Sequence, residues 1–268
     1  MQPGVTHLIL PQMPYAEFFQ KAARAGYEVV EIDMRQPGQG ELTTQSSESD
    51  LKKIAAQAED AGVKIVSMCH IQLTESLLAG GDKQRTAIDQ TLVGLRAASI
   101  MGIKNTLHVL GAQSPDVYYD DAYRNTVRAF QQLAPHCEKL NVDIAYEFTW
   151  NGFLFSPMEI RRFLDEINSP RIGFYFDPGN MAVFQYPHHW VRIIGKHIKM
   201  VHLKDWKTGS YGPLGGAWPP LLQGTVDYVA MNRELRAIGY DGPMISEVPT
   251  KDASLEDTAA AIRKIMAM

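Results

Sequence analysis

Four side chains able to bind a metal or move a proton follow apolar runs in the second half of the sequence. They are Glu147, Asp177, His202 and Glu247, which close the runs DIAYE, IGFYFD, IKMVH and PMISE. Near-continuous apolar runs that end abruptly in polar residues are typical of buried parallel strands. Carboxylates with an imidazole form a mixed oxygen and nitrogen shell that suits a divalent cation and leaves carboxylates for proton transfer.

Each of these residues also has an ordinary structural interpretation. Asp177 precedes Pro178-Gly179-Asn180 and could simply end its strand in a turn. His202 could be a hydrogen-bonded interior histidine. The metal site is favoured if these strands are parallel and form one barrel, because their carboxyl ends would then bring all four side chains into one basin. Buried charges in such a basin are costly unless they are paired or bound to a metal.

Eight apolar runs alternate with eight amphipathic segments, and no break in composition marks a linker. The expected strands are 6–10, 29–35, 64–70, 105–111, 142–148, 171–177, 198–205 and 243–248. The expected helices are 15–25, 49–61, 83–101, 119–140, 157–167, 188–196, 227–238 and 255–266. This alternation predicts an α/β fold, a single-domain (β/α)8 TIM barrel over residues 1–268.

Composition narrows the possible partners and the location. The formal charge of −4 argues against nucleic acid, whose binding requires clustered Lys and Arg. The start of the sequence has no basic leader, and Pro11 interrupts its short apolar segment, so we expect neither a signal peptide nor a membrane span. Two cysteines, Cys69 and Cys137, do not make a disulfide framework, which favours a reducing, cytoplasmic compartment.

The interval between His202 and Glu247 is longer than the other strand intervals. The excess falls at 207–225, a stretch rich in Gly, Pro and Trp that follows the seventh expected strand. Loops after strands form the active face of such barrels, so this one is expected to be a lid or specificity loop. The alternative is a solvent-exposed excursion without a role.

Several motifs together resemble those of a known family. They are AYEFTWNGFLFSP (145–157), YFDPGNM (175–181), VHLKDW (201–206), QGTVDY (223–228) and GYDGPMISEV (239–248). Over nearly its whole length the chain resembles the xylose isomerase-like barrels. These include sugar-phosphate isomerases and epimerases, ketose 3-epimerases, hydroxypyruvate isomerases, inosose dehydratases and, more distantly, endonuclease IV.

The resemblance implies a ligand set and a reaction. It implies that Glu147, Asp177, His202 and Glu247 bind Mn²⁺, Mg²⁺ or Co²⁺, and that Glu147 and Glu247 are also the catalytic acid–base pair. The implied reaction is epimerisation or isomerisation of a small ketose or ketose phosphate. A divalent cation holding two neighbouring sugar oxygens would spread the charge of an enediolate. Two carboxylates on opposite faces would then remove a proton from one side and return it on the other.

Candidate substrate-binding residues lie near the same strand ends. They are His70, His108, Trp150, Asn151, Asn180 and Lys204. Lys204 shares a strand face with His202 and could hold a hydroxyl or a phosphate oxygen, although a surface lysine is an equal alternative. His70 and His108 are expected to face the basin, unless they are satisfied polar groups beneath a loop. Glu31 and Asp33, two residues apart, are further possible pocket groups.

Three positions depart from the tagatose and psicose epimerase branch of the family. That branch carries a histidine three residues after the aspartate ligand, a glutamate six after the first glutamate and an arginine six after the histidine. This chain has Asn180, Phe153 and Thr208 there. The departures argue against a free ketohexose as the natural substrate.

Other functions on the same scaffold stay open from the sequence. A lyase that dehydrates an inosose or eliminates from a 3-keto sugar would begin with the same proton abstraction. A phosphodiesterase like endonuclease IV would require more histidine ligands and a basic surface. A sugar-binding barrel without catalysis would leave the acid–base pair unexplained. The expected partner is a small carbohydrate, and a homodimer or homotetramer is compatible with exposed barrel helices.

Overall fold

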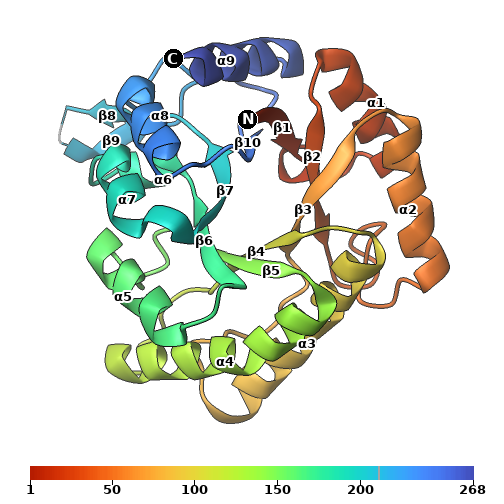
Figure 1. Ribbon diagram of the computed structural model, residues 1–268, viewed down its shortest axis with the longest axis vertical. Coiled ribbons are helices and arrows are strands. Elements are labelled where there is room, and N and C mark those ends of the chain that lie inside the picture. Colours follow the sequence, from red (N-terminus) through yellow and green to blue (C-terminus); the bar gives the residue numbers. More distant parts are fainter. Residues whose placement is uncertain (211) are drawn as a thin grey trace.

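The computed structural model describes residues 1–210 and 212–268, and its centre is a closed barrel of eight parallel strands. The strands are β1 (Gln2–Thr6), β2 (Val29–Met34), β3 (Lys64–His70), β4 (Asn105–Val109), β5 (Asp143–Glu147), β6 (Ile172–Phe176), β7 (Ile198–Leu203) and β10 (Pro243–Ser246). Each strand pairs with its neighbour in sequence, and β10 closes the ring against β1. Figure 1 shows this ring inside a ring of helices. The predicted (β/α)8 TIM barrel is therefore confirmed.

Helices return the chain from the end of one strand to the start of the next. They are α1 (Tyr15–Ala25), α2 (Glu48–Asp60), α3 (Gly81–Ile100), α4 (Tyr119–Leu140), α5 (Pro157–Ile167), α6 (Pro178–Ala182), α7 (Pro187–Ile194), α8 (Tyr228–Ala237) and α9 (Leu255–Ala267). Local sequence sets their ends. Ser47 and Asp50 form a capping box before α2, and α4 ends where Asn141 adopts a left-handed φ of 54°. No helix in the described parts of the chain is long and apolar enough to cross a membrane.

The prediction of the first strand at 6–10 is wrong. The strand is Gln2–Thr6, and His7–Ile9 form a 3-10 turn in which the Thr6 side chain accepts a hydrogen bond from the backbone of Leu8. Gly4 lies inside the strand, where a Cβ would come within 2.8 Å of the Val29 side chain. A glycine that is typical of loops in sequence is thus required here by the close approach of the neighbouring strand.

Alternation along the strands separates two buried layers. Inside the barrel, one side chain from each of six strands forms a small apolar cluster: Cys69, Leu107, Ala145, Tyr175, Met200 and Ile245. A larger apolar core lies between the strands and the helices. Both cysteines are buried and free. Residues that follow the inner cluster by two positions, such as Glu147, Asp177 and His202, therefore continue toward the carboxyl end of the barrel on its inner side.

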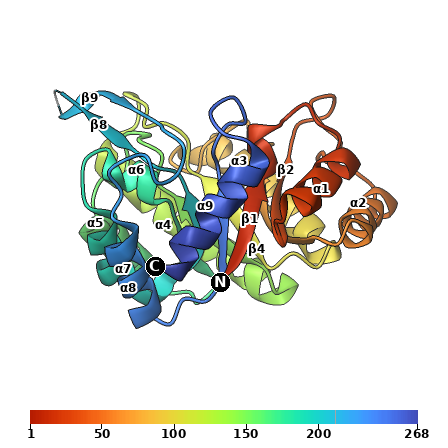
Figure 2. The same cartoon turned by 90° about the horizontal axis from the view of Figure 1, so that it is seen from above.

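The stretch after β7 contains a small antiparallel hairpin, β8 (Lys207–Gly209) and β9 (Gly212–Ala217). Figure 2 shows it projecting at the end of the barrel opposite the two chain termini. The buried Asp205 holds both ends of the excursion, because its carboxylate accepts the backbone N–H groups of Trp206 (2.9 Å), Gly224 (2.9 Å) and Val226 (3.2 Å). The backbone N–H of Thr225 also donates to the Trp206 carbonyl at 2.7 Å.

Candidate active site

The barrel brings the four predicted ligands together at its carboxyl end. One ligand atom from each of Glu147, Asp177, His202 and Glu247 lies within 4.8 Å of the others. The Nδ1 atom of His202 is 3.4 Å from Glu147 Oε1 and 3.4 Å from Glu247 Oε2. The first three side chains are buried, and Glu247 is partly exposed. Four residues spread over a hundred positions of sequence thus surround one point.

A buried carboxylate on the opposite side of the imidazole fixes the orientation of His202. Glu31 Oε1 lies 2.9 Å from His202 Nε2, and both side chains are fully buried. A carboxylate only accepts, so Nε2 carries a proton, and Nδ1 is the ring nitrogen that faces the cluster and could bind a cation. The Tyr175 ring packs against the imidazole with a centroid distance of 4.4 Å. This arrangement of a carboxylate behind a histidine is the usual support for a metal-ligating histidine.

Glu31 is itself held by three hydroxyl groups. Thr6 Oγ1 donates to Oε1 at 2.9 Å, while Ser67 Oγ and Tyr175 Oη each donate to Oε2 at 2.7 Å. Burial would raise the pKa of Glu31, but His202, Ser67 and Tyr175 lower it below the ordinary value. The sequence alone predicts Glu31 only as a possible pocket group. Its partners come from strands β1, β3, β6 and β7, so its role depends on the closed barrel.

The two carboxylate oxygens of Asp177 make different contacts. Oδ1 accepts the backbone N–H groups of Gly179 (2.8 Å) and Asn180 (3.2 Å), which caps the short helix α6. Oδ2 is buried and makes no hydrogen bond with the described residues, although the Lys204 ammonium lies 3.1 Å away. The turn interpretation and the ligand interpretation of Asp177 are therefore compatible.

Each glutamate is positioned by a neighbouring polar side chain. Asn180 Nδ2 donates to Glu147 Oε1 at 3.1 Å and to the Phe148 carbonyl at 2.8 Å. Lys204 Nζ donates to Glu247 Oε2 at 2.7 Å. The structure thus brings two of the predicted substrate-binding residues, Asn180 and Lys204, into direct contact with the cluster.

The charges of this cluster fit a divalent cation. Four carboxylates (Glu31, Glu147, Asp177 and Glu247) face one ammonium group and one imidazole, which leaves buried negative charge in excess. Burial raises the pKa of Glu147, and the nearby Glu247 raises it further. Burial also tends to raise the pKa of Glu247, but Lys204 and His202 lower it below the ordinary value.

The buried His202 Nδ1 and Asp177 Oδ2 lack hydrogen-bond partners in the described chain. An oxygen-rich set with one imidazole, in which two buried ligand atoms make no hydrogen bond, suits Mn²⁺, Mg²⁺ or Co²⁺.

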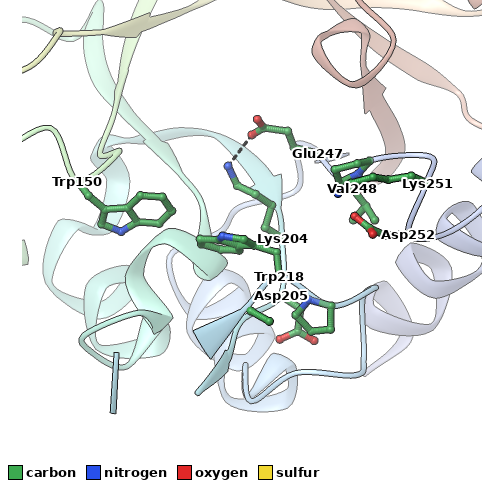
Figure 3. A pocket seen from close by; sticks show the side chains of 11 residues that line it. Trp150, Lys204, Asp205, Trp218, Glu247, Val248, Lys251 and Asp252 are labelled. Atoms are coloured by element: carbon green, nitrogen blue, oxygen red, sulfur yellow. Dashed lines mark hydrogen bonds and ion pairs between the residues drawn. The ribbon is translucent and has the colours of Figure 1, made fainter. Parts of the chain in front are cut away.

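A cavity of about 500 Å³ opens beside the cluster. Figure 3 shows Lys204 reaching Glu247 between Trp150 on one side and Val248, Lys251 and Asp252 on the other. Trp218, which follows the hairpin, also lines this cavity. The long loop after β7 therefore contributes to the wall of the site.

The structure does not bring His70 and His108 to the cluster, and the expectation that they face the basin is wrong. Their strand neighbours Cys69 and Leu107 occupy the barrel interior, so the histidines point outward to the helices. A Cβ added at Gly94 of α3 would lie 2.3 Å from the His70 ring, and His108 Nε2 lies 3.2 Å from Thr91 Oγ1 in the same helix. Burial lowers the pKa of both imidazoles.

The remaining candidates have structural partners close to the site. Trp150 Nε1 donates to the Asn180 carbonyl at 3.0 Å. Asn151 Nδ2 donates to the Gly111 carbonyl at 2.6 Å, which fastens the loop after β5 to the loop after β4. Asp33 lies 2.6 Å from His7 and is also bonded to Arg35, away from the four-residue cluster.

Comparisons with known proteins agree with this architecture. The family model described as xylose isomerase-like TIM barrel matches residues 19–267. The L-ribulose-5-phosphate 3-epimerase UlaE of Escherichia coli K12 is 25% identical over 255 residues, which cover 93% of this chain and 87% of that protein. A D-psicose 3-epimerase structure determined with D-fructose superposes with a TM-score of 0.81 at 16% identity, covering 100% of both chains. The 3-keto-D-glucoside 4-epimerase YcjR of E. coli superposes with a TM-score of 0.77 at 13% identity, again over 100% of both chains.

Proposed function

The chain belongs to the xylose isomerase-like TIM-barrel family and is an enzyme of the sugar isomerase and epimerase type; from this premise we propose that it is a divalent-metal-dependent ketose epimerase. It would act on a small ketose or ketose derivative by removing and returning a proton beside the carbonyl. The observation that carries the proposal is the four-residue cluster, with two glutamates facing one histidine Nδ1 at 3.4 Å each.

The proposed ligands are Glu147, Asp177, His202 and Glu247. A divalent cation held there would withdraw charge from two neighbouring substrate oxygens and make the adjacent C–H more acidic. Glu31 holds the proton on His202 Nε2, so Nδ1 is available as a ligand. Mn²⁺, Mg²⁺ and Co²⁺ all accept this set of ligands.

Glu147 and Glu247 are the proposed acid–base pair. Asn180 fixes Oε1 of Glu147 and Lys204 fixes Oε2 of Glu247, so the other oxygen of each carboxyl is left to hold or release a proton. The pKa of Glu147 is raised and that of Glu247 is lowered, which favours one protonated and one ionised carboxyl at neutral pH. Such a pair can take a proton from one face of a planar intermediate and deliver another to the opposite face. That sequence inverts the carbon, whereas return to the adjoining carbon from the same side gives isomerisation.

The rest of the proposed site positions the sugar. Lys204 and Asn180 would hold hydroxyl oxygens, and Trp150 with Asn151 would form the wall above them. The E. coli relatives that match along 93% of this chain are named as 3-epimerases of L-ribulose 5-phosphate, which favours epimerisation over the alternatives. A lyase on the same scaffold is the second candidate, because Lys204 beside Glu247 could protonate a leaving group after the same first step.

Deuterium exchange tests the reaction. The Mn²⁺-loaded protein is incubated in D₂O with a panel of ketoses, and products are analysed by mass spectrometry and NMR. Deuterium at a retained carbon with inverted configuration supports epimerisation, and loss of water or of an aglycone supports the lyase. Glu147→Gln and Glu247→Gln should each reduce exchange by roughly 10²–10⁴-fold. Bound metal, measured in the same samples, separates loss of the base from loss of the cation. Absence of exchange with every ketose would contradict the proposal.

The proposal includes a cytoplasmic location and self-association. Free buried Cys69 and Cys137 are in keeping with a reducing compartment. Exposed barrel helices commonly pair, so a homodimer or homotetramer is expected. Size-exclusion chromatography with light scattering measures the oligomeric state, and a monomer at micromolar concentration would contradict that part.

A further inference from the structure

The cavity beside the cluster is lined mainly by the loops that follow the last two barrel strands, with Trp150 added from the loop after β5. Many barrels bind phosphate between these two loops. Here the cavity has a volume of about 500 Å³, a size typical of sites that enclose a molecule of drug size. Its apolar lining includes Trp150, Trp218, Pro219, Val248 and Pro249. We infer that it binds an uncharged ring or aglycone attached to the reacting sugar, packed against Trp150 and Trp218, and that it does not bind a phosphate group. This inference rests on the proposed function and specifies its substrate class.

Three tryptophans form a continuous aromatic wall. The Trp150 and Trp218 ring centroids are 5.0 Å apart at an interplanar angle of 33°, and Trp218 lies 4.7 Å from Trp206 at 60°. Trp206 is buried, and Gly216 of β9 packs against its ring so closely that a Cβ would lie 2.0 Å away. The hairpin thus packs against Trp206, and this packing fixes the position of Trp218.

Trp150 is held in an unusual backbone conformation. Its φ of 54° is left-handed, which is costly for a bulky residue, yet the residue is 39% exposed. The hydrogen bond from its indole Nε1 to the Asn180 carbonyl and its contact with Trp218 keep the ring at the cavity wall. Asn180 also bonds to Glu147, so the aromatic wall and the acid–base pair share one support. A flat aromatic face next to polar anchors suits the apolar C–H face of a sugar ring or an aromatic aglycone.

The charged side chains around the cavity carry no excess of positive charge that would favour a phosphate group. Lys204 and Lys251 line it together with Glu247 and Asp252, and the fifth charged residue, Asp205, is buried with its carboxylate bound by three backbone N–H groups. Lys204 already contacts two carboxylates, Glu247 at 2.7 Å and Asp177 at 3.1 Å. Its charge is therefore compensated by these carboxylates, so Lys204 is not a free cationic partner for a dianion.

A second cavity at the ends of β1 and β2 offers no stronger phosphate site. It has a volume of about 520 Å³ and includes Arg35, Asp33 and Glu41. The Arg35 guanidinium is bonded to the buried Asp33 carboxylate. Arg35 nevertheless provides a useful variant, because a phosphate substrate bound on that side would depend on it.

Tryptophan fluorescence and kinetics test the inference together. The Mn²⁺-loaded protein is titrated with phenyl β-D-glucoside, D-ribulose 5-phosphate and inorganic phosphate. Deuterium exchange is then measured with phenyl 3-keto-β-D-glucoside and D-ribulose 5-phosphate. We expect phenyl β-D-glucoside to quench the tryptophan emission. We also expect kcat/KM for the uncharged phenyl 3-keto-β-D-glucoside to be at least tenfold higher than kcat/KM for D-ribulose 5-phosphate. Trp218→Leu should raise the Kd for phenyl glucoside and the KM for the keto-glycoside about tenfold, with a smaller effect on kcat, while Trp218→Phe should restore most of the binding. Trp190→Phe, in the core away from this cavity, is the control for loss of one tryptophan.

Two outcomes would overturn the inference. One is preferred exchange of D-ribulose 5-phosphate, especially if Arg35→Gln abolishes that preference. The other is quenching by phenyl glucoside that is the same in Trp218→Leu as in wild type. If phenyl glucoside binds in a Trp218-dependent manner but no ketose exchanges deuterium, the cavity assignment holds and the proposed reaction fails.

Discussion

Replacing Glu31 by glutamine should weaken metal binding without a change in any ligand. Glu31 accepts hydrogen bonds from Thr6, Ser67, Tyr175 and His202 at 2.7 to 2.9 Å, and only a carboxylate can accept from all four. A glutamine turns one acceptor into a donor. Either a hydroxyl group reorients, or His202 Nε2 loses its acceptor and the proton moves to Nδ1, which then cannot bind a metal. Loss of such a supporting group typically lowers metal affinity by about 10–100-fold, equivalent to roughly 1.4–2.8 kcal/mol.

The assay is a competition titration of Mn²⁺ against a fluorescent chelator, with unfolding by urea measured in parallel. Asp33→Asn is the matched control, because Asp33 lies two residues along the same strand, is equally buried, and bonds to His7 and Arg35. Both variants should lose about 1–3 kcal/mol of stability. Only Glu31→Gln should lose Mn²⁺ affinity. An unchanged Mn²⁺ affinity in Glu31→Gln would refute the assigned protonation of His202.

Three further predictions test the ligand set, the buried histidines and the hairpin. His202→Ala should lower bound Mn²⁺ by at least tenfold with a smaller effect on the melting temperature, and equal metal content in mutant and wild type would contradict the site. Burial lowers the pKa of His108 from 6.5 to about 4; the unfolded chain therefore binds a proton first as pH falls, and the free energy of unfolding should drop by about 3 kcal/mol between pH 7 and pH 4. Urea denaturation of His108→Gln should show a shallower pH dependence, and an identical slope would exclude this histidine as a cause. Gly216→Ala should displace the hairpin from Trp206 and shift tryptophan emission to longer wavelength, whereas Ala217→Ser should leave it unchanged.

Most of the barrel could be predicted from sequence because each strand carries its own apolar run. The predicted 64–70 strand matches β3, and the predicted 119–140 helix matches α4. The convergence of Glu147 and His202 followed from the same reasoning, since parallel strands in a barrel end at one face. Local pattern and overall topology agree at these positions.

Features set by contacts between distant segments could not be predicted. The role of Glu31 depends on Tyr175, 144 residues away. The composition of Gly212–Ala217 does not indicate a strand. This strand depends on the packing of Gly216 against the Trp206 ring. The sequence correctly predicts His70 and His108 near strand ends but not the side to which they point, because it does not show which of two alternating faces meets the helices.

Because Asp205 fixes both ends of the excursion after β7, the sequence of this segment can change independently of the residues that form the four-residue cluster. Since Asp205 and Thr225 close the segment at its base, the tip can change in length or sequence at little entropic cost to the barrel. Trp218 lies within that segment, while Glu147 and Glu247, the proposed acid–base pair, lie outside it. Grafting the segment from a related barrel between these two anchor points should therefore exchange the preferred sugar derivative and leave the underlying reaction intact.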